Sequence, residues 1–354
     1  MKPQSRPSEF ARTDHPGDLT PYLIRLLDGE TLGADQTADV FRAIMTGQSE
    51  HSEVGALLAL MATRMPSVEE LIGAATVMRE KVDRLDLGVP EDVLLDTAGT
   101  GGAPKTFNVS TAAAIIAAAS GCKVAKHGNR SRTGRGSAEV LEALGMNVDA
   151  GHETQRKCLE AANICFCYAI HHHPAAKHAM PVRKALGFPT IFNLLGPLTN
   201  PAGAGRQVMG VYRIEFVTPV ARALARLGST RALVVHSEEG LDEFGLGSPS
   251  HVAQVDQGDV REYTIAPGDL GLRVVPYREL QAHDLEDAVQ IVRGVLSGED
   301  RGPHRDVVLL NAAAAIHAGG QADSIEAALA VAAQTVDFGA ARQTLDKLVE
   351  VSNT

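Results

Sequence analysis

A change of residue pattern near position 91 is the feature that most constrains the fold of this chain. Before it, residues 18–90 place apolar side chains at spacings of three and four, as in LTPYLIRLLDG and ADQTADVFRAIM, which predicts amphipathic helices. After it, short apolar runs alternate with helical segments, which is typical of a largely parallel sheet covered by helices. We therefore predict an α/β protein: a small all-helical N-terminal domain, then a large α/β domain with a mostly parallel central sheet flanked by helices.

The same pattern indicates where these parts begin and end. Residues 1–17 are polar and contain several prolines, and we expect a flexible tail there. The helical domain spans residues 18–90, and its fourth segment opens at Ser67 with the pattern of a capping box. In the α/β part, we expect strands at VLLDTAG, KVAKHG, ICFCYAI, ALVVHS and VVLLNAA.

Composition argues against several classes of protein. With 44% hydrophobic and 21% charged residues, the chain is expected to be globular, and its formal net charge of −10 argues against a nucleic-acid-binding surface. No apolar run approaches the roughly 18 residues of a transmembrane helix, and the N-terminus lacks the apolar core of a signal peptide. The four cysteines show no spacing typical of zinc, so we expect reduced cysteines in a cytoplasmic protein with no membrane attachment.

The first candidate site is the glycine-rich turn at residues 99–102, directly after the first predicted strand. Glycines let the backbone approach a ligand and direct N–H groups toward it. Ser110 and Thr111 then open an alanine-rich helix, with Asn108 just before them, and the start of a helix favours bound anions. This combination predicts phosphate binding; an ordinary tight turn with Ser110 as the helix cap is the alternative.

The second candidate site is the loop that follows the strand KVA and begins with Lys126 and His127. It gathers the cations Lys126, Arg130, Arg132 and Arg135 among small residues, in an otherwise acidic protein. Cations concentrated at the end of a strand suit a polyanion such as pyrophosphate. A solvated charged loop is the alternative.

Adjacent carboxylates form the third candidate site. Asp242 and Glu243 follow the predicted strand ALVVHS, and such a pair suits Mg²⁺, which prefers hard oxygen ligands. A solvated acidic turn is the alternative. No metal is expected at the consecutive histidines His171, His172 and His173, because neighbouring side chains of an extended segment point in alternating directions.

The motifs GTGG, NVST, KHGNR, GSAEVLEALG, HPAAKHAMPVRKALG, IFNLLGPLTNP and GLDE occur in this order along the chain. From about residue 18 to about residue 350, this series resembles the anthranilate phosphoribosyltransferase family, which shares its fold with the pyrimidine nucleoside phosphorylases. The resemblance implies a homodimer formed through the helical domain, a helical insert near residues 182–210, and an α/β domain at residues 91–181 and 211–354. It implies phosphoribosyl pyrophosphate and anthranilate as substrates and Mg²⁺ as cofactor, in a cleft between the domains.

The resemblance also implies roles for individual residues. Phosphoribosyl pyrophosphate would be held by Gly99, Thr100, Gly101, Gly102, Thr106, Asn108, Ser110, Thr111, Lys126, Asn129 and Ser137. Anthranilate would be held by His127, Asn129, Arg183 and Pro197. The metal ligands would be Ser110, Asp242 and Glu243.

The implied reaction requires no protein nucleophile, because the amine of anthranilate itself displaces pyrophosphate from the ribose. The protein would act by positioning and electrostatic stabilisation, with Arg183 suited to the carboxylate of anthranilate. The chain departs from the family pattern after GTGG, where an acidic residue is usual. It has Ala103-Pro104-Lys105 instead, and Lys105 adds a cation.

Two alternatives stay open on the sequence alone. One is a phosphoribosyltransferase of the same fold that uses another aromatic amine. The other is a non-catalytic paralogue that binds nucleic acid, against which the net charge and the intact acidic pair both argue. A nucleoside phosphorylase is disfavoured by the block IFNLLGPLTNP, which belongs to the anthranilate branch.

Overall fold

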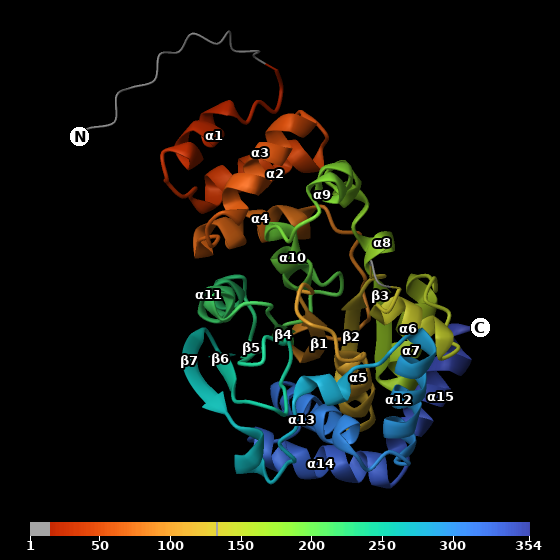
Figure 1. The fold of residues 1–354 in the computed structure, drawn as a ribbon. Helices are drawn as coiled ribbons and strands as arrows, with labels where there is room; N and C mark the ends of the chain where they lie inside the picture. Colours follow the sequence, from red (N-terminus) through yellow and green to blue (C-terminus); the bar gives the residue numbers. More distant parts are fainter. Residues whose placement is uncertain (1–14, 132–133) are drawn as a thin grey trace.

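The computed structural model of the chain describes residues 15–131 and 134–354 (Figure 1). Most of the tail expected at residues 1–17, and Arg132 of the cationic loop, lie outside these residues. A helical region lies at one end of the molecule and a larger α/β region at the other (Figure 1).

The N-terminal region consists of helices, as the spacing of its apolar residues predicts. These are α1 (Thr20–Leu27), α2 (Ala34–Met45), α3 (His51–Ala62) and α4 (Val68–Glu80). Phe41, Leu57 and Leu71 are completely buried between them. The predicted cap of α4 is confirmed, because the Ser67 hydroxyl accepts a hydrogen bond from the Glu70 N–H.

The α/β region is built on one sheet, and the prediction of a mostly parallel arrangement is confirmed. The strand order is β3-β2-β1-β4-β5-β6-β7, in which β6 pairs antiparallel with both β5 and β7 and the other pairs are parallel. The strands are β1 (Leu94–Gly99), β2 (Lys123–Gly128), β3 (Ile164–Tyr168), β4 (Arg206–Gly210), β5 (Arg231–Ser237), β6 (Ser250–Asp256) and β7 (Asp259–Ile265). The C-terminal ends of β1, β2, β4 and β5 therefore meet at one edge.

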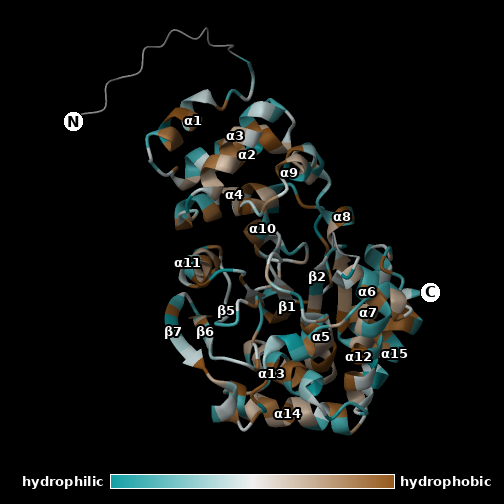
Figure 2. Ribbon diagram, viewed as in Figure 1, coloured by the Kyte–Doolittle hydropathy of each residue, from teal (hydrophilic) through white to brown (hydrophobic). Residues whose placement is uncertain are grey.

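Helices cover both faces of this sheet. They are α5 (Val109–Ala119), α6 (Ser137–Ala143), α7 (His152–Ala162), α11 (Val217–Arg226), α12 (Leu285–Ser297), α13 (Pro303–Ala318), α14 (Ile325–Asp337) and α15 (Ala340–Ser352). Three short helices connect β3 to β4: α8 (Ala169–His172), α9 (Met180–Leu186) and α10 (Ile191–Leu195). Of these, α9 and α10 contact α3 and α4 of the helical region. Helices in both regions carry polar and apolar residues side by side, as amphipathic helices do (Figure 2).

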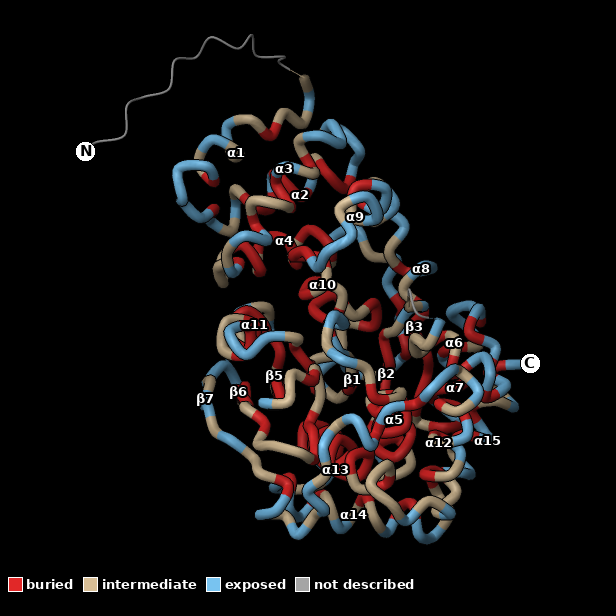
Figure 3. Tube along the Cα trace, viewed as in Figure 1, coloured by how far each residue is buried: buried red, intermediate tan, exposed pale blue. Residues whose placement is uncertain are grey.

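The two faces of the sheet belong to different hydrophobic cores, and the buried segments of both appear in Figure 3. In β5, Leu233 and Val235 pack into the core that contains α5 and α13. The alternating residues Ala232 and Val234 pack into the core that contains α11. This second core continues through α10 into the N-terminal helices, so one face of the sheet and the helical region share a single apolar core.

The structure corrects two expectations about secondary structure. The run VVLLNAA, predicted as a strand, lies in α13, where every residue from Val307 to Ala318 is buried. A helix buried on all sides shows no amphipathic spacing, so its apolar run resembles a buried strand. Within residues 182–210, expected to be a helical insert, Arg206–Gly210 forms β4. This short strand is stabilised by pairing with β1 and β5 on its two sides, which its own residue pattern does not reveal.

Within residues 15–131 and 134–354, no helix is both long and apolar enough to cross a membrane. All the cysteines of the chain are described, and each of them is free and buried.

A buried carboxylate ties the N-terminal helices together. Glu70 on α4 is completely buried and accepts hydrogen bonds from the N–H groups of Leu32, at 2.9 Å, and Ser67, at 2.8 Å. The guanidinium of Arg64 donates to both of its oxygens, at 2.8 and 2.5 Å. Burial by itself raises the pKa of Glu70, but Arg64 and these N–H groups hold the pKa below its usual value.

Replacing Glu70 with Gln should destabilise the helical region, because the amide loses the charged pair with Arg64 and places a donor where donors already point. We expect a loss of about 1.5–3 kcal/mol in the free energy of unfolding, measured by urea denaturation. Glu69→Gln is the matched control: Glu69 precedes Glu70 but is half-exposed and pairs with Arg226 at the surface, so its replacement should change stability less. Native stability of the Glu70→Gln variant would contradict this role.

Candidate active site

A cavity of about 430 Å³ opens where the sheet meets the helical region. Residues at the C-terminal ends of β1, β2, β4 and β5 form its floor, and residues of α9 and α10 contribute a wall. In parallel α/β sheets, this edge is where ligands bind.

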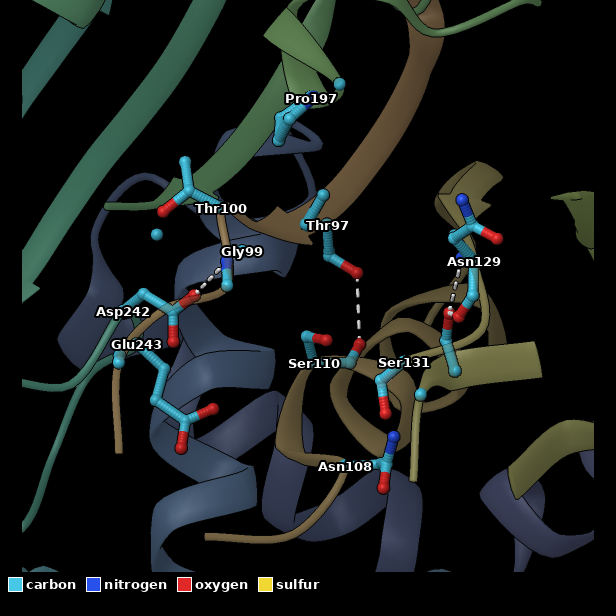
Figure 4. Close-up of a pocket in the computed structure, with 18 of the residues that line it drawn as sticks. Thr97, Gly99, Thr100, Asn108, Ser110, Asn129, Ser131, Pro197, Asp242 and Glu243 are labelled. Atoms are coloured by element: carbon cyan, nitrogen blue, oxygen red, sulfur yellow. Dashed lines mark hydrogen bonds between the residues drawn. The ribbon is translucent and has the colours of Figure 1, made fainter. Parts of the chain in front are cut away.

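The structure brings most of the predicted site residues to this one cavity, and Figure 4 shows a selection of them. Those that line it are Gly99, Thr100, Gly101, Gly102, Thr106, Asn108, Ser110, Lys126, His127, Asn129, Ser137, Arg183, Pro197, Asp242 and Glu243. Thr111 is not among them. It is completely buried in α5, and its hydroxyl has no hydrogen-bond partner among the described residues.

The glycine-rich turn after β1 lets the acidic loop approach closely. Gly101 and Gly102 have φ angles of 64° and 95°, in the left-handed region that favours glycine. The Gly101 N–H donates to Asp242 Oδ2 at 2.8 Å, so the turn holds the acidic pair in place. A Cβ on Gly99 would lie 2.5 Å from Asp242 Oδ2, and one on Gly210 would lie 1.6 Å from Asp242 O. Glycine at both positions is therefore a steric requirement of this contact.

Both carboxylates of the acidic pair lie partly buried in the cavity wall. Burial raises the pKa of Asp242, although the Gly101 N–H acts in the opposite direction. Burial also raises the pKa of Glu243 to about 8, against the hydrogen bond that the Thr106 hydroxyl donates at 2.6 Å. Two neighbouring carboxylates in a desolvated site suit a divalent cation, because the positive charge of the cation stabilises their ionised form. Ser110 faces them across the cavity (Figure 4).

Lys126 places a positive charge at the floor of the cavity, beside the start of α5. The Lys126 Nζ donates to Thr97 O at 2.7 Å and lies 3.5 Å from the Ser110 hydroxyl. Burial lowers the pKa of Lys126 to about 8, and the nearby Asp96 acts in the opposite direction. An ammonium fixed next to a helix start is suited to a phosphate group.

Asp96 is a residue of this region that the sequence pattern does not reveal. It is completely buried on β1, and its Oδ1 accepts a hydrogen bond from the His127 N–H at 3.0 Å. Its Oδ2 accepts a hydrogen bond from Asn200 Nδ2 at 2.8 Å, and the same Nδ2 donates to Ala125 O at 2.8 Å. Asp96 therefore joins β1 to β2 and to the loop that carries Pro197. The only signal in the sequence is one carboxylate inside an apolar strand.

The consecutive histidines have different partners, but His171 and His172 lie in the short helix α8 and not in the extended segment that we expected. His171 pairs with the carboxylate of Asp149 at 2.8 Å. The Nδ1 of His172 hydrogen-bonds to Asp83 O at 2.9 Å. His173 contacts His127 instead.

His173 forms a hydrogen-bonded pair with His127, a predicted residue of the cavity. The two Nε2 atoms lie 3.2 Å apart, so one ring donates a hydrogen bond to the other. Burial lowers the pKa of His173 to about 4. Burial, followed by the neighbouring His173, lowers the pKa of His127 well below its usual value. The pair is therefore neutral in the folded protein at neutral pH.

Arg183 reaches the cavity from the helical side. It lies on α9, and its guanidinium stacks over the Phe192 ring of α10, 4.9 Å from the ring centre. Pro197 lines the same cavity (Figure 4). A planar cation in this wall suits a carboxylate, whose two oxygens match its paired N–H groups.

Arg135 of the predicted cationic loop also lines the cavity, as do Lys105 and Asn311. The Asn311 amide donates to Phe244 O at 2.9 Å and accepts from the Phe244 N–H at 3.1 Å, directly after Glu243. Asn311 lies in the run that we expected to be a strand. Because this run was expected to be a strand, the sequence did not indicate that Asn311 holds the acidic loop in place.

Comparisons with known proteins agree with this geometry. Residues 91–342 match the family described as "Glycosyl transferase family, a/b domain", and residues 20–82 match its helical bundle domain. These matches define the class as a glycosyltransferase with a helical bundle and an α/β domain.

Individual relatives narrow this class. The anthranilate phosphoribosyltransferase of Halorhodospira halophila is 44% identical over 334 residues, which cover 94% of this chain and 97% of the relative. The crystal structure of the Thermus thermophilus enzyme of that name matches with a TM-score of 0.86 and 38% identity, over 94% of this chain and 99% of that one. The Saccharomyces cerevisiae enzyme in complex with PRPP and Mg matches with a TM-score of 0.84 and 26% identity, over 95% and 98% of the two chains. Another structure of the yeast enzyme contains 4-fluoroanthranilate. This chain belongs to the anthranilate phosphoribosyltransferase family.

The His127–His173 pair should make stability depend on pH. Below about pH 6.5 an unfolded histidine takes up a proton, whereas the folded pair stays neutral, so the unfolded state gains stability as the pH falls. The melting temperature should therefore fall between about pH 6.5 and about pH 4, and His173→Gln should make that fall shallower. His171→Gln is the control, because this half-exposed ring lies outside the His127–His173 pair. An unchanged slope for His173→Gln would contradict the prediction.

Proposed function

We propose that this protein transfers the phosphoribosyl group of phosphoribosyl pyrophosphate to the amine of anthranilate, giving N-(5-phosphoribosyl)anthranilate and pyrophosphate for tryptophan biosynthesis. One observation carries the proposal: a single cavity combines a glycine-rich turn, a buried lysine and an acidic pair with an arginine from the helical side. The ligands named for the yeast enzyme, PRPP with Mg and 4-fluoroanthranilate, support the same substrates.

The sheet side of the cavity would hold phosphoribosyl pyrophosphate. Its polar groups come from the start of α5, from Lys126 and from the loop between β2 and α6. In that loop the Ser137 hydroxyl accepts a hydrogen bond from the Asn129 N–H at 3.2 Å, which fixes both residues at the cavity. Thr111 would act only through the helix start, because its hydroxyl is buried. These donors and cations would stabilise the charge that develops on the departing pyrophosphate.

The helical side would hold anthranilate. Arg183 would pair with the carboxylate, and His127, Asn129 and Pro197 would complete the wall. The amine would then face the anomeric carbon of the ribose, and the carbon–oxygen bond to pyrophosphate would break as the carbon–nitrogen bond forms. Catalysis would come from alignment of two substrates rather than from a protein nucleophile.

The acidic pair suits Mg²⁺. Asp242 and Glu243 are adjacent, partly buried and already oriented by the Gly101 N–H and the Thr106 hydroxyl. We propose that they hold the ion, with Ser110 on the opposite side of the cavity. When bound, the ion would neutralise negative charge on pyrophosphate.

We extend the proposal to the assembly of the protein. Residues 18–90, together with the helices between β3 and β4, would form the helical domain, and the rest of the chain the α/β domain. Ile24 and Leu27 on α1 and Met180 on α9 expose 50%, 57% and 51% of their surface, which suits contact with a second copy in a homodimer. The free cysteines suit a cytoplasmic location.

The direct test is turnover. Purified protein with phosphoribosyl pyrophosphate and Mg²⁺ should consume anthranilate, followed by the loss of anthranilate fluorescence. Turnover with another aromatic amine but not with anthranilate would make the acceptor assignment wrong, and no turnover with any amine would overturn the proposal.

Arg183→Ala should impair the use of anthranilate in particular. The loss of a charged hydrogen bond to the carboxylate should cost about 1.5–3 kcal/mol in kcat/KM for anthranilate. The KM for phosphoribosyl pyrophosphate should change little, because its cations lie on the sheet side. Lys184→Ala, an exposed neighbour on the same helix, is the control. Equal losses for both substrates would contradict a carboxylate-specific role.

Replacing Asp242 with Asn and Glu243 with Gln should abolish the metal requirement together with the activity. We expect turnover to fall by about 10²–10³-fold, while the melting temperature is kept or raised, because both side chains keep their size and the amides cannot become desolvated carboxylates. Mg²⁺ binding, measured by calorimetry, should disappear. Glu238→Gln, an exposed carboxylate in the same connection, should leave both properties unchanged. Normal activity of the double variant at low Mg²⁺ would refute the assignment.

A further inference from the structure

A cluster of two histidines and one aspartate lies apart from the residues that line the cavity, where three segments of the chain meet. Asp83 follows α4 in the connection to the sheet, His152 is the first residue of α7, and His172 is the last residue of α8. Each side chain can offer one ligand atom, and these atoms all lie within 4.8 Å of one another. Imidazole nitrogen and carboxylate oxygen are typical ligands of zinc in proteins.

Hydrogen bonds fix the relative positions of Asp83 and His172. The Asp83 N–H donates to His172 O at 2.8 Å. The His172 Nδ1 hydrogen-bonds to Asp83 O at 2.9 Å, so this ring nitrogen is the one that faces Asp83. Because His172 is completely buried, its ring has little freedom to move. Two of the three residues are therefore positioned before an ion arrives.

His152 completes the cluster from the solvent side. Its Nε2 lies 3.4 Å from Asp83 Oδ2, and the two side chains expose 46% and 55% of their surface. Bonds from zinc to nitrogen and oxygen are about 2.0–2.1 Å long, so two ligand atoms of a tetrahedral zinc ion lie about 3.3 Å apart. The spacing of His152 and Asp83 therefore suits an ion, and the exposed side of the cluster gives an ion a path from solvent.

The surroundings of His172 also provide for the change of tautomer that metal binding requires. Without an ion, Nδ1 carries the hydrogen that Asp83 O accepts, and Nε2 accepts a hydrogen bond from Gln155 Nε2 at 3.3 Å. With an ion on Nδ1, that hydrogen would move to Nε2 and would need an acceptor. Gln155 Oε1 is buried and has no hydrogen-bond partner among the described residues. A turn of this amide would supply the acceptor, in exchange for its hydrogen bond to Phe166 O, and such an acceptor behind a ligating histidine is typical of metal sites.

A second cluster of the same residue types, His15, Asp18 and Glu53, is less suited to an ion. Both of its carboxylates already accept hydrogen bonds from N–H groups at the start of α1, at 2.9 and 3.1 Å. In contrast, the partner of the Asp83 carboxylate is His152, which belongs to the same cluster. The cluster around Asp83 is therefore the better candidate, and the cluster around His15 serves as its comparison.

We propose that Asp83, His152 and His172 form a binding site for zinc, separate from the acidic pair of the cavity. Water would supply the fourth ligand, because two of the three side chains face solvent. The ion would join the connection after α4 to α7 and α8, and α8 lies where the helical region adjoins the α/β region (Figure 1). The site uses one of the three consecutive histidines, so it does not require all three to converge.

The test measures zinc binding to the full chain by calorimetry, after treatment with EDTA and removal of the EDTA. The background is the variant with Asp242→Asn and Glu243→Gln, so that the acidic pair does not contribute. We expect this protein to bind one zinc ion and zinc to raise its melting temperature, because the ion binds only the folded chain. Adding His152→Gln or Asp83→Asn should weaken binding about tenfold or more, because each change removes a ligand.

The controls are His171→Gln, next to the site, and His15→Gln, in the other cluster. Each should change zinc affinity less than about twofold, because neither residue supplies a ligand. Asp83 and His152 are half-exposed, so their variants should keep the melting temperature of the zinc-free background. No zinc binding to the background protein, native affinity in either site variant, or an equal loss in the controls would each overturn the proposal. These measurements involve no substrate, so their outcome is independent of the turnover test.

Discussion

The buried carboxylate of Asp96 is the interaction on which the cavity depends. Its two oxygens accept hydrogen bonds from His127 and from Asn200, and Asn200 lies 104 residues from Asp96 along the chain. A buried carboxylate without such donors costs several kcal/mol, so these segments must meet if the fold is to form. The need to pair this carboxylate therefore fixes two parts of the cavity. These are the floor next to Lys126 and the loop that carries Pro197.

The shared apolar core gives the cavity its second wall. Because the core of α11 continues through α10 into the N-terminal helices, the helical region is packed against the sheet through buried side chains. Arg183 and Phe192 are therefore presented to the cavity from the side opposite to the strand ends. An anionic sugar phosphate and a flat aromatic acid would therefore meet where the wall formed by the strand ends adjoins the wall formed by the helical side.

Much of this arrangement could be predicted from the sequence, and the failures have physical causes. The N-terminal helices could be predicted because each has one face in contact with solvent, which gives an amphipathic spacing. The strands VLLDTAG and KVAKHG could be predicted because each is a short apolar run with one end in contact with solvent. The run VVLLNAA misleads because α13 is buried on every side, and β4 is missed because its stability comes from its neighbours β1 and β5. The glycine-rich turn lines the cavity, and its role in binding phosphate stays a prediction. The bond from Gly101 to Asp242, like the partners of Asp96, joins distant segments and has no local signal.

The contact between Gly210 and the backbone of Asp242 also bears on how this protein tolerates sequence change. Any side chain at position 210 would have to occupy space that a carbonyl oxygen already fills, at 1.6 Å from the new atom. A deep mutational scan would therefore mark position 210 as intolerant to every substitution, as it would a residue that reacts with substrate. The cause would be crowding of the main chain, so intolerance in such a scan measures the space available as well as the chemistry performed.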